Sequence, residues 1–218
     1  MVLKGLNIDG VIKVDNARVY GLDESIIASG YPMQTYTVDL NELENELETL
    51  NKSIITVKDL KRVMHLGNAV PGSGHDCFLK GIIVQFDLQV PEYIWRQLDR
   101  YHFIDYISSQ SKMHRITRID LDSVCNRYVH EEVKEILKSI IDKYEAETDV
   151  DKKKELFNII IANTPSGLML TARMTTNYLQ LKSIINQRSN HKMQEWGHLC
   201  DWFKTLPMLE ELVCKSRC

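Results

Sequence analysis

Positively charged side chains gather in one stretch of the sequence, residues 91–115, which reads PEYIWRQLDRYHFIDYISSQSKMHR. It places Arg96, Arg100, Lys112 and Arg115 among aromatic residues, directly after an apolar run that is typical of a strand. Guanidinium and ammonium groups bind phosphate through charge-assisted hydrogen bonds, so this density favours an anion site the size of a nucleotide phosphate. The alternative is an amphipathic helix whose aromatic residues pack inward while its charges face water.

The composition is that of a soluble globular protein with room for one domain and a sizeable core. The chain has 218 residues, of which 44% are hydrophobic and 26% charged, and its formal net charge is -3 with a sequence pI of about 6.2. A protein without excess positive charge lacks the positively charged surface that binds the phosphate backbone of a nucleic-acid polymer. A single nucleotide remains compatible, because it needs only one local cluster of cations.

The cysteines and the hydropathy pattern exclude several other classes of protein. The five cysteines are widely spaced and form no CxxC pair, so a disulfide framework or a structural zinc site is not expected. No carboxylate-histidine cluster has the spacing of a metal site. The N-terminus lacks the features of a signal peptide, and no apolar run approaches the length of a membrane span. We therefore expect a cytoplasmic protein that binds neither metal nor membrane.

The hydrophobic pattern predicts a single α+β domain over residues 1–218. Residues 1–38 carry short β-type runs broken by glycines, and a strand is predicted over Ile83–Val90. The glycine-rich turn Pro71–Cys77 precedes that strand, and its φ freedom lets backbone approach a ligand. Apolar residues at helical spacing predict helices over residues 39–51, Thr56–His65, Glu131–Glu147, Val150–Ala162, Met169–Gln187 (the longest) and Trp196–Phe203.

The order of these pieces resembles the flavin-dependent thymidylate synthases. That family has a Gly-His turn, an apolar strand ending in Pro, and then a Trp-x-Gln-x-x-Arg-His-Arg sequence. Here Gly74-His75 is followed by the strand to Pro91, and then by Trp95-Arg96-Gln97-Leu98-Asp99-Arg100 without a gap. The resemblance implies the family's fold, a small mixed or antiparallel sheet with several helices, one of them a long C-terminal helix.

A second block of residues resembles the same family. It consists of Pro165, Thr171, Thr175-Thr176-Asn177, Arg188 and Gln194-Glu195-Trp196, with Asn177 and Arg188 at the family's spacing. With Ala17-Arg18-Val19 near the start, the matches extend from about residue 17 to about residue 203. The chain departs from the pattern at Tyr101-His102, at Ser108 to Arg115, and at Ile161, Leu179 and Ser183, where the family has other polar or charged residues.

The resemblance implies which residues bind the nucleotide. Arg100 would hold the substrate phosphate together with Ser111, Lys112 and Arg115. The alternatives are a salt bridge from Arg100 to Asp99 or Asp105 and a solvated Ser/Lys/Arg loop. Gln97 matches a glutamine near the nucleotide, although such a residue is also common on a helix surface.

Arg188 would be catalytic, stabilising negative charge on the pyrimidine ring as the ring is activated, in addition to binding substrate. The other interpretation is a cation that complements the dipole at a helix C-terminus, and the two roles can coexist.

The resemblance also implies a flavin site. His75, Asn177 and His191 match flavin-contacting positions, with His191 shifted by one residue, and Tyr101 and His102 would stack on a ring of the cofactor. Asn177 is unfavourable inside a long helix, so we expect a partner that compensates. The alternatives are a turn-capping role for His75 and ordinary half-buried packing for Tyr101 and His102.

The activity implied is transfer of a one-carbon unit from methylenetetrahydrofolate to C5 of a pyrimidine deoxynucleotide such as dUMP, with reduced FAD as hydride donor and NADPH as reductant. The family forms homotetramers with shared sites. The altered loop makes a phage-type member with a changed product, such as a hydroxymethylated pyrimidine, a further hypothesis. The rival is a nucleotide-binding or interaction protein that kept the scaffold and lost flavin and catalysis, an interpretation favoured by Ile161 and Leu179.

Overall fold

The computed structural model describes residues 3–35, 39, 55–70 and 72–214. The chain divides into two compact units, and each is described by itself. The first contains residues 1–3, 17–85 and 175–218, and the second contains residues 4–16 and 86–174. The single-domain prediction stays a prediction, and the predicted acidic helix over residues 39–51 lies almost wholly outside the described residues.

A five-stranded sheet with the order β1-β2-β3-β5-β4 accounts for the strands. These are β1 (Leu6–Ile8), β2 (Ile12–Tyr20), β3 (Ile83–Pro91), β4 (Ile104–Ser109) and β5 (Met169–Asn177). β1 and β2 form an antiparallel hairpin in which Leu6 pairs with Val14 and Ile8 with Ile12. The hairpin turn contains Gly10 at φ 62°, a left-handed conformation that glycine adopts without strain. Together with the helices, this sheet confirms the predicted α+β class.

Strand β3 agrees with the sequence pattern almost residue for residue. Val84, Phe86, Leu88 and Val90 are fully buried, and the residues between them are half-buried. Successive side chains of a strand point to opposite faces of the sheet, so this alternation gives β3 one core face and one more polar face.

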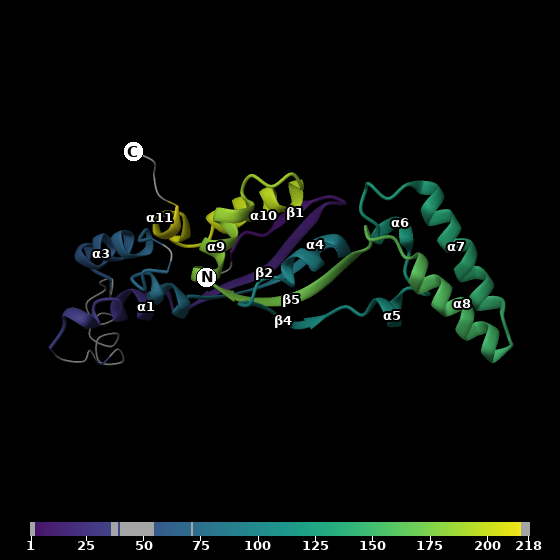
Figure 1. Ribbon diagram of the computed structural model, residues 1–218, viewed down its shortest axis with the longest axis horizontal. Coiled ribbons are helices and arrows are strands. Elements are labelled where there is room, and N and C mark those ends of the chain that lie inside the picture. Colours follow the sequence, from purple (N-terminus) through teal and green to yellow (C-terminus); the bar gives the residue numbers. More distant parts are fainter. Residues whose placement is uncertain (1–2, 36–38, 40–54, 71, 215–218) are drawn as a thin grey trace. The chain divides into compact units, whose positions relative to one another are not determined.

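The described helices are divided between the two units. They are α1 (Leu22–Ala28), α3 (Val57–Gly67), α4 (Glu92–Leu98), α5 (Lys112–Arg115), α6 (Leu121–Val124), α7 (Glu131–Ala146), α8 (Val150–Asn163), α9 (Tyr178–Arg188), α10 (Gln194–Lys204) and α11 (Leu209–Val213), with the 3-10 turns η1 (Tyr31–Met33) and η2 (Cys77–Gly81). Figure 1 shows α7 and α8 as an antiparallel hairpin. The helices predicted at α3, α7, α8 and α10 are confirmed.

Helix α3 illustrates why these predictions hold. Thr56 and Asp59 form a capping box: the Thr56 hydroxyl accepts from the Asp59 backbone N–H, and the Asp59 carboxylate accepts from the Thr56 backbone N–H. Two backbone donors at the helix start are thus satisfied reciprocally. The helix ends at Gly67, as the Gly-Asn pair predicts.

The predicted long helix Met169–Gln187 is wrong over its first half. Residues Met169–Asn177 form strand β5, and α9 begins only at Tyr178. The spacing of Leu170 and Met174 suggested a helix, but burial alternates through Ala172, Met174 and Thr176, the period of a strand. Asn177 has extended backbone and caps α9, with its carboxamide oxygen accepting from Gln180 N at 2.9 Å. The strain expected of an asparagine inside a helix therefore does not arise.

Several short elements escaped the sequence analysis. α1, β4, α5 and α6 were not expected, and α11 follows Pro207, so the helix at Trp196–Phe203 is not the last one. Four of these elements are helices of four to seven residues, too short to show a clear periodicity.

Each unit has its own core. In the first unit, the largest fully buried side chains include Trp196, Tyr178 and Phe203, all from the C-terminal helices. In the second unit, Leu137 of α7 and Ile160 of α8 pack in one cluster with Ile116, Leu121, Cys125 and Leu168. Within the described residues, no helix is both long and apolar enough to cross a membrane.

Candidate functional site

In the second unit, the predicted phosphate ligand Lys112 is held by a carboxylate. Its ammonium lies 3.3 Å and 3.2 Å from the two carboxylate oxygens of Glu92, at the first position of α4. Arg96, one turn further along α4, approaches the same carboxylate at 3.6 Å. The Lys112 side chain is only 22% exposed, so this ion pair is partly shielded from water. The pair fixes where the ammonium points and compensates much of its charge.

Arg115 is attached to strand β5 through Gln110. Its guanidinium donates to the side-chain oxygen of Gln110, which also accepts from the Thr171 backbone N–H at 3.1 Å. The Gln110 backbone N–H in turn donates to the Thr171 carbonyl at 2.9 Å. This glutamine therefore sets the direction of Arg115 relative to β5.

Ser111 performs a local structural task. Its hydroxyl oxygen accepts from the His114 backbone N–H at 3.4 Å and so caps α5, a helix of four residues. Ser111, Lys112 and Arg115 thus lie on one short element, Ser111 as its N-cap and Lys112 and Arg115 as its first and last residues. The hydroxyl is engaged as an acceptor and remains able to donate its proton.

The remaining predicted residues of the second unit lie on α4 or just after it. The Gln97 side chain donates to the Tyr93 carbonyl of its own helix at 3.4 Å. Arg100 and His102 are exposed in the loop between α4 and β4, and Tyr101 is half-buried with its N–H on the Leu98 carbonyl. Arg100 is therefore accessible from solvent.

In the first unit, Arg188 lies over an aromatic ring at the end of α9. Its guanidinium carbon is 4.7 Å from the ring centroid of Trp196, and Trp196 is fully buried. A cation over an indole face is attracted by the ring quadrupole, and this attraction helps to hold the guanidinium beside the ring. The predicted catalytic arginine is therefore held beside Trp196 at the C-terminus of α9.

His191 lies in the same cluster. Its backbone N–H donates to the Arg188 carbonyl at 3.0 Å, its Nδ1 accepts from Met193 N at 3.1 Å, and its ring meets Trp196 edge-on at 6.3 Å. Partial burial, and then the cations Arg188 and Lys192, lower the pKa of His191 below its ordinary value. The ring is thus neutral at pH 7, and because Nδ1 is the acceptor, Nε2 carries the proton and is a donor.

The other predicted flavin residues of this unit lie elsewhere on it. Asn177 and Arg188 mark opposite ends of the 11-residue helix α9, roughly 16 Å apart at 1.5 Å per residue. His75 is exposed on the glycine-rich turn, where Gly72 and Gly74 have φ of 85° and 80°. A Cβ added at either glycine would meet no atom within 4 Å, so the turn has open space beside it.

The sequence analysis missed the partners of the predicted residues. Glu92 binds Lys112, Gln110 binds Arg115, and a buried pair, Asp76 and Lys182, lies at 2.6 Å beneath the glycine-rich turn. Glu92 stands four residues before Arg96, a spacing that predicts an ion pair on a helix and could have drawn attention to it. Gln110 and Asp76 carry no comparable local signal.

The positions that depart from the family pattern have local structural roles. Ile161 on α8 packs against the core cluster of the second unit. Ser183 on α9 accepts from the Gln187 side chain at 3.3 Å, and Leu179 is half-buried in the first turn of α9. Ile161, one of the departures from the family pattern, is thus a packing residue.

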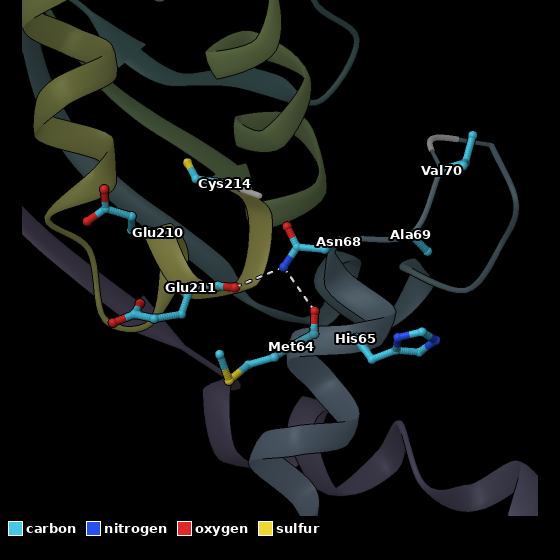
Figure 2. A pocket seen from close by; sticks show the side chains of 8 residues that line it. All are labelled: Met64, His65, Asn68, Ala69, Val70, Glu210, Glu211 and Cys214. Carbon is cyan, nitrogen blue, oxygen red and sulfur yellow. Dashed lines mark hydrogen bonds between the residues drawn. The ribbon is translucent and has the colours of Figure 1, made fainter. Parts of the chain in front are cut away.

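A pocket of about 880 Å³ on the first unit was also not predicted. Figure 2 shows it between the end of α3 and α11, lined by Met64, His65, Asn68, Ala69, Val70, Glu210, Glu211 and Cys214. Asn68 joins the two walls, donating to the carbonyls of Met64 at 2.9 Å and Glu211 at 3.0 Å. Within the described lining, two carboxylates and no lysine or arginine are present, so this wall does not suit a phosphate.

No family model and no curated protein matches this sequence. Two solved structures of flavin-dependent thymidylate synthase ThyX from Helicobacter pylori, both with FAD and dUMP, are similar in structure. One has a TM-score of 0.64 and 13% identity and covers 90% of this chain and 95% of that chain. The other has a TM-score of 0.63 and 13% identity, with coverage of 91% and 97%. The chain therefore has the fold of a flavin-dependent thymidylate synthase.

Proposed function

We propose that this protein is an enzyme of the flavin-dependent thymidylate synthase type. It transfers a one-carbon unit to C5 of a pyrimidine deoxynucleotide, dUMP or a close relative, with reduced FAD as the hydride donor. The proposal is supported by a fold shared along nine-tenths of the chain with an enzyme solved with both FAD and dUMP.

The observation that carries the proposal is the position and support of Arg188. An arginine held against a fully buried indole is suited to this role, because the charge is already positioned before the ligand arrives. Arg188 stabilises the negative charge that develops on the pyrimidine ring when C5 becomes nucleophilic. The Nε2–H of the neutral His191 adds a hydrogen-bond donor to the same cluster.

The phosphate of the nucleotide is assigned to the second unit. Arg100 is accessible and supplies a bidentate guanidinium, and Arg115 supplies a second one that Gln110 directs. Lys112 contributes less net charge because Glu92 compensates it, and Ser111 can donate its hydroxyl proton. Gln97, which matches a family glutamine in sequence, is assigned to the nucleotide as well.

The residues assigned to the flavin fit that group. The open space beside Gly72 and Gly74 lets their backbone approach a flat ring system, and His75 follows at the surface of this turn. Asn177 uses its carboxamide oxygen as a helix cap, which leaves the NH2 group as a donor. Tyr101 and His102 are placed on a loop where stacking is accessible. When bound, reduced FAD supplies the hydride.

The co-substrates and the assembly follow the same resemblance. Methylenetetrahydrofolate supplies the one-carbon unit, NADPH supplies electrons, and the protein acts as a homotetramer whose sites draw residues from more than one subunit. The altered loop at Ser108 to Arg115 favours a changed product, such as a hydroxymethylated pyrimidine.

A second candidate is a nucleotide-binding protein on the same scaffold without catalysis. Two observations favour it: Ile161 belongs to a core cluster where the family binds substrate, and Lys112 is already ion-paired with Glu92. Such a protein would bind a nucleotide without binding FAD.

A thermal-shift panel separates the two candidates. Purified protein is heated with FAD, dUMP, dCMP or no ligand, because a ligand that binds only the folded state raises the melting temperature by mass action. The enzyme proposal expects stabilisation by FAD and a larger shift with FAD and dUMP together. Stabilisation by a nucleotide alone, with no response to FAD, would establish the second candidate instead.

A further inference from the structure

Lys182 is a fully engaged cation in the interior of the first unit. It lies on α9 between Leu181 and Ser183 and is only 5% exposed, and burying a charge is costly unless it is paired and hydrogen-bonded. Its ammonium donates to the carbonyls of Gly67 at 2.7 Å and Ala69 at 3.0 Å and to the carboxylate of Asp76 at 2.6 Å. An ammonium has three N–H donors, so all of them are used.

The three acceptors lie at the two ends of one segment. Gly67 and Ala69 lie at the end of α3, and Asp76, itself 4% exposed, lies immediately before η2. A single ammonium therefore joins the chain entering the glycine-rich turn to the chain leaving it. The tip between them, from Gly72 to His75, is exposed and has open space beside both of its glycines.

Glycines allow the tip many backbone conformations, so its geometry must be set from its ends. A backbone bond from Ser73 to the Val70 carbonyl and one from Cys77 to the Gly74 carbonyl order it locally. The hydrogen bonds of Lys182 connect these local turns to α9. This is the helix that has Asn177 at its start and Arg188 at its end.

We propose that Lys182 is a positioning residue, which sets the geometry of the glycine-rich turn relative to α9 and thereby places His75 for a flavin. The placement of His75 for a flavin rests on the proposed function. The ordering of the turn by Lys182 does not depend on that function. One helix then positions three of the four first-unit groups assigned to the ligands: Asn177 and Arg188 directly, at its two ends, and His75 through the Lys182–Asp76 pair.

The test separates positioning from general stability. Lys182→Met alone leaves the Asp76 carboxylate buried without its cation, so it destabilises the fold and can prevent folding. The informative variant is therefore the double substitution Asp76→Leu with Lys182→Met, which replaces both charges by apolar groups of similar size. It leaves no unpaired buried charge, so it is less destabilising than Lys182→Met alone, even though the Gly67 and Ala69 carbonyls lose their donor. Tyr178→Phe is the matched control, because it removes a buried hydrogen bond of α9, from the Tyr178 hydroxyl to the Pro207 carbonyl at 2.7 Å, away from the turn.

Two measurements are made on each protein: amide hydrogen exchange at Gly72 to Asp76 and FAD affinity from the change in flavin absorbance. In the double variant we expect exchange at these amides at least about tenfold faster than in the wild type. If the competent conformation of the turn falls to about a tenth of the population, the dissociation constant for FAD rises about tenfold. The Tyr178→Phe variant keeps wild-type values for both.

The outcomes distinguish this inference from the function on which it rests. Wild-type exchange at Gly72 to Asp76 in the double variant overturns the role of Lys182 in ordering the turn, whether or not FAD binds. Faster exchange with unchanged FAD affinity overturns the link from the turn to the flavin. A wild-type protein that does not bind FAD refutes the proposed function, while the exchange data still decide whether Lys182 orders the turn.

Discussion

Two cations assigned to the ligands are held in different ways. Arg188 in the first unit lies 4.7 Å over the ring of Trp196, and Lys112 in the second unit lies 3.2 Å from a carboxylate oxygen of Glu92. An aromatic face orients a guanidinium without neutralising it, whereas a carboxylate both orients an ammonium and compensates its charge. The first arrangement suits stabilisation of charge that develops during a reaction. The second arrangement suits an ammonium that shifts from its carboxylate partner toward an anion when the anion binds.

The largest effect is expected at Arg188. Arg188→Ala should lower the rate of product formation from dUMP about 100-fold to 1,000-fold, the loss typical when a preorganised group that stabilises developing charge is removed. Arg188→Lys should not restore the rate, because an ammonium cannot present a planar fork. The measurement is single-turnover product formation followed by mass spectrometry.

Lys192→Ala is the matched control, since it removes an exposed positive charge four residues further along the chain. Equal losses of rate in Arg188→Ala and Lys192→Ala would mean that only the local positive potential matters. The contrast between Arg188 held by a ring and Lys112 held by a carboxylate would then explain nothing about catalysis.

Lys112 and Glu92 should give opposite effects on nucleotide affinity. Lys112→Met should weaken dUMP binding about tenfold, the range of one hydrogen bond to a charged group. Glu92→Gln should tighten it a few-fold, because the ammonium then keeps more of its charge for the phosphate. Calorimetric titration of both variants and the double variant gives the coupling, and Lys143→Met on the exposed face of α7 is the control. Weaker binding in Glu92→Gln would show that the carboxylate itself serves the ligand.

Ser111 tests whether a capping residue also serves the phosphate. Ser111→Ala should cost about 1 kcal/mol of stability through the lost cap of α5, measured by denaturant unfolding. Ser111→Asp should keep the cap and the stability but weaken dUMP binding, because it adds a negative charge beside the phosphate. If the aspartate variant binds dUMP as well as the wild type, Ser111 only caps the helix.

The smallest effect concerns His191. Its pKa is lowered in the folded state by partial burial and by Arg188 and Lys192, so the unfolded chain takes up the proton first as the pH falls. His191 therefore contributes stability above about pH 6.5, and this contribution is lost progressively below that value. His191→Asn, which keeps an acceptor for Met193 N, should flatten the decline of melting temperature between about pH 6.5 and 5. An unchanged dependence of the melting temperature on pH would show that His191 does not contribute to the loss of stability at low pH.

The fold could be predicted where one period dominates a long segment. The alternation of β3 and the helical stripes of α3, α7 and α8 are local properties of the sequence, and the structure agrees with them. β5 was read as a helix because apolar residues at Leu170 and Met174 satisfy a helical spacing as well as a strand spacing, and only sheet pairing decides between them.

The candidate site was predictable in its residue types but not in its partners. The cluster of cations at residues 91–115 is evident from residue type, whereas Arg188 is identified only through the family resemblance. Glu92 and Lys112 are 20 residues apart and Asp76 and Lys182 are 106 apart, so which charges meet is set by tertiary structure. These partners show that the charge of Lys112 is compensated by Glu92 and that the glycine-rich turn is anchored through Asp76 and Lys182.

The most direct test of the central claim is a complete reaction. The protein is incubated with dUMP, methylenetetrahydrofolate and chemically reduced FAD without oxygen, and both flavin absorbance and the nucleotide products are recorded. The proposed function predicts that flavin is oxidised only when dUMP and the folate are both present, with a C5-modified nucleotide formed in proportion. Arg188→Ala should slow both signals about 100-fold to 1,000-fold. Reduced flavin that stays reduced, with dUMP recovered unchanged from the wild-type protein, would contradict it.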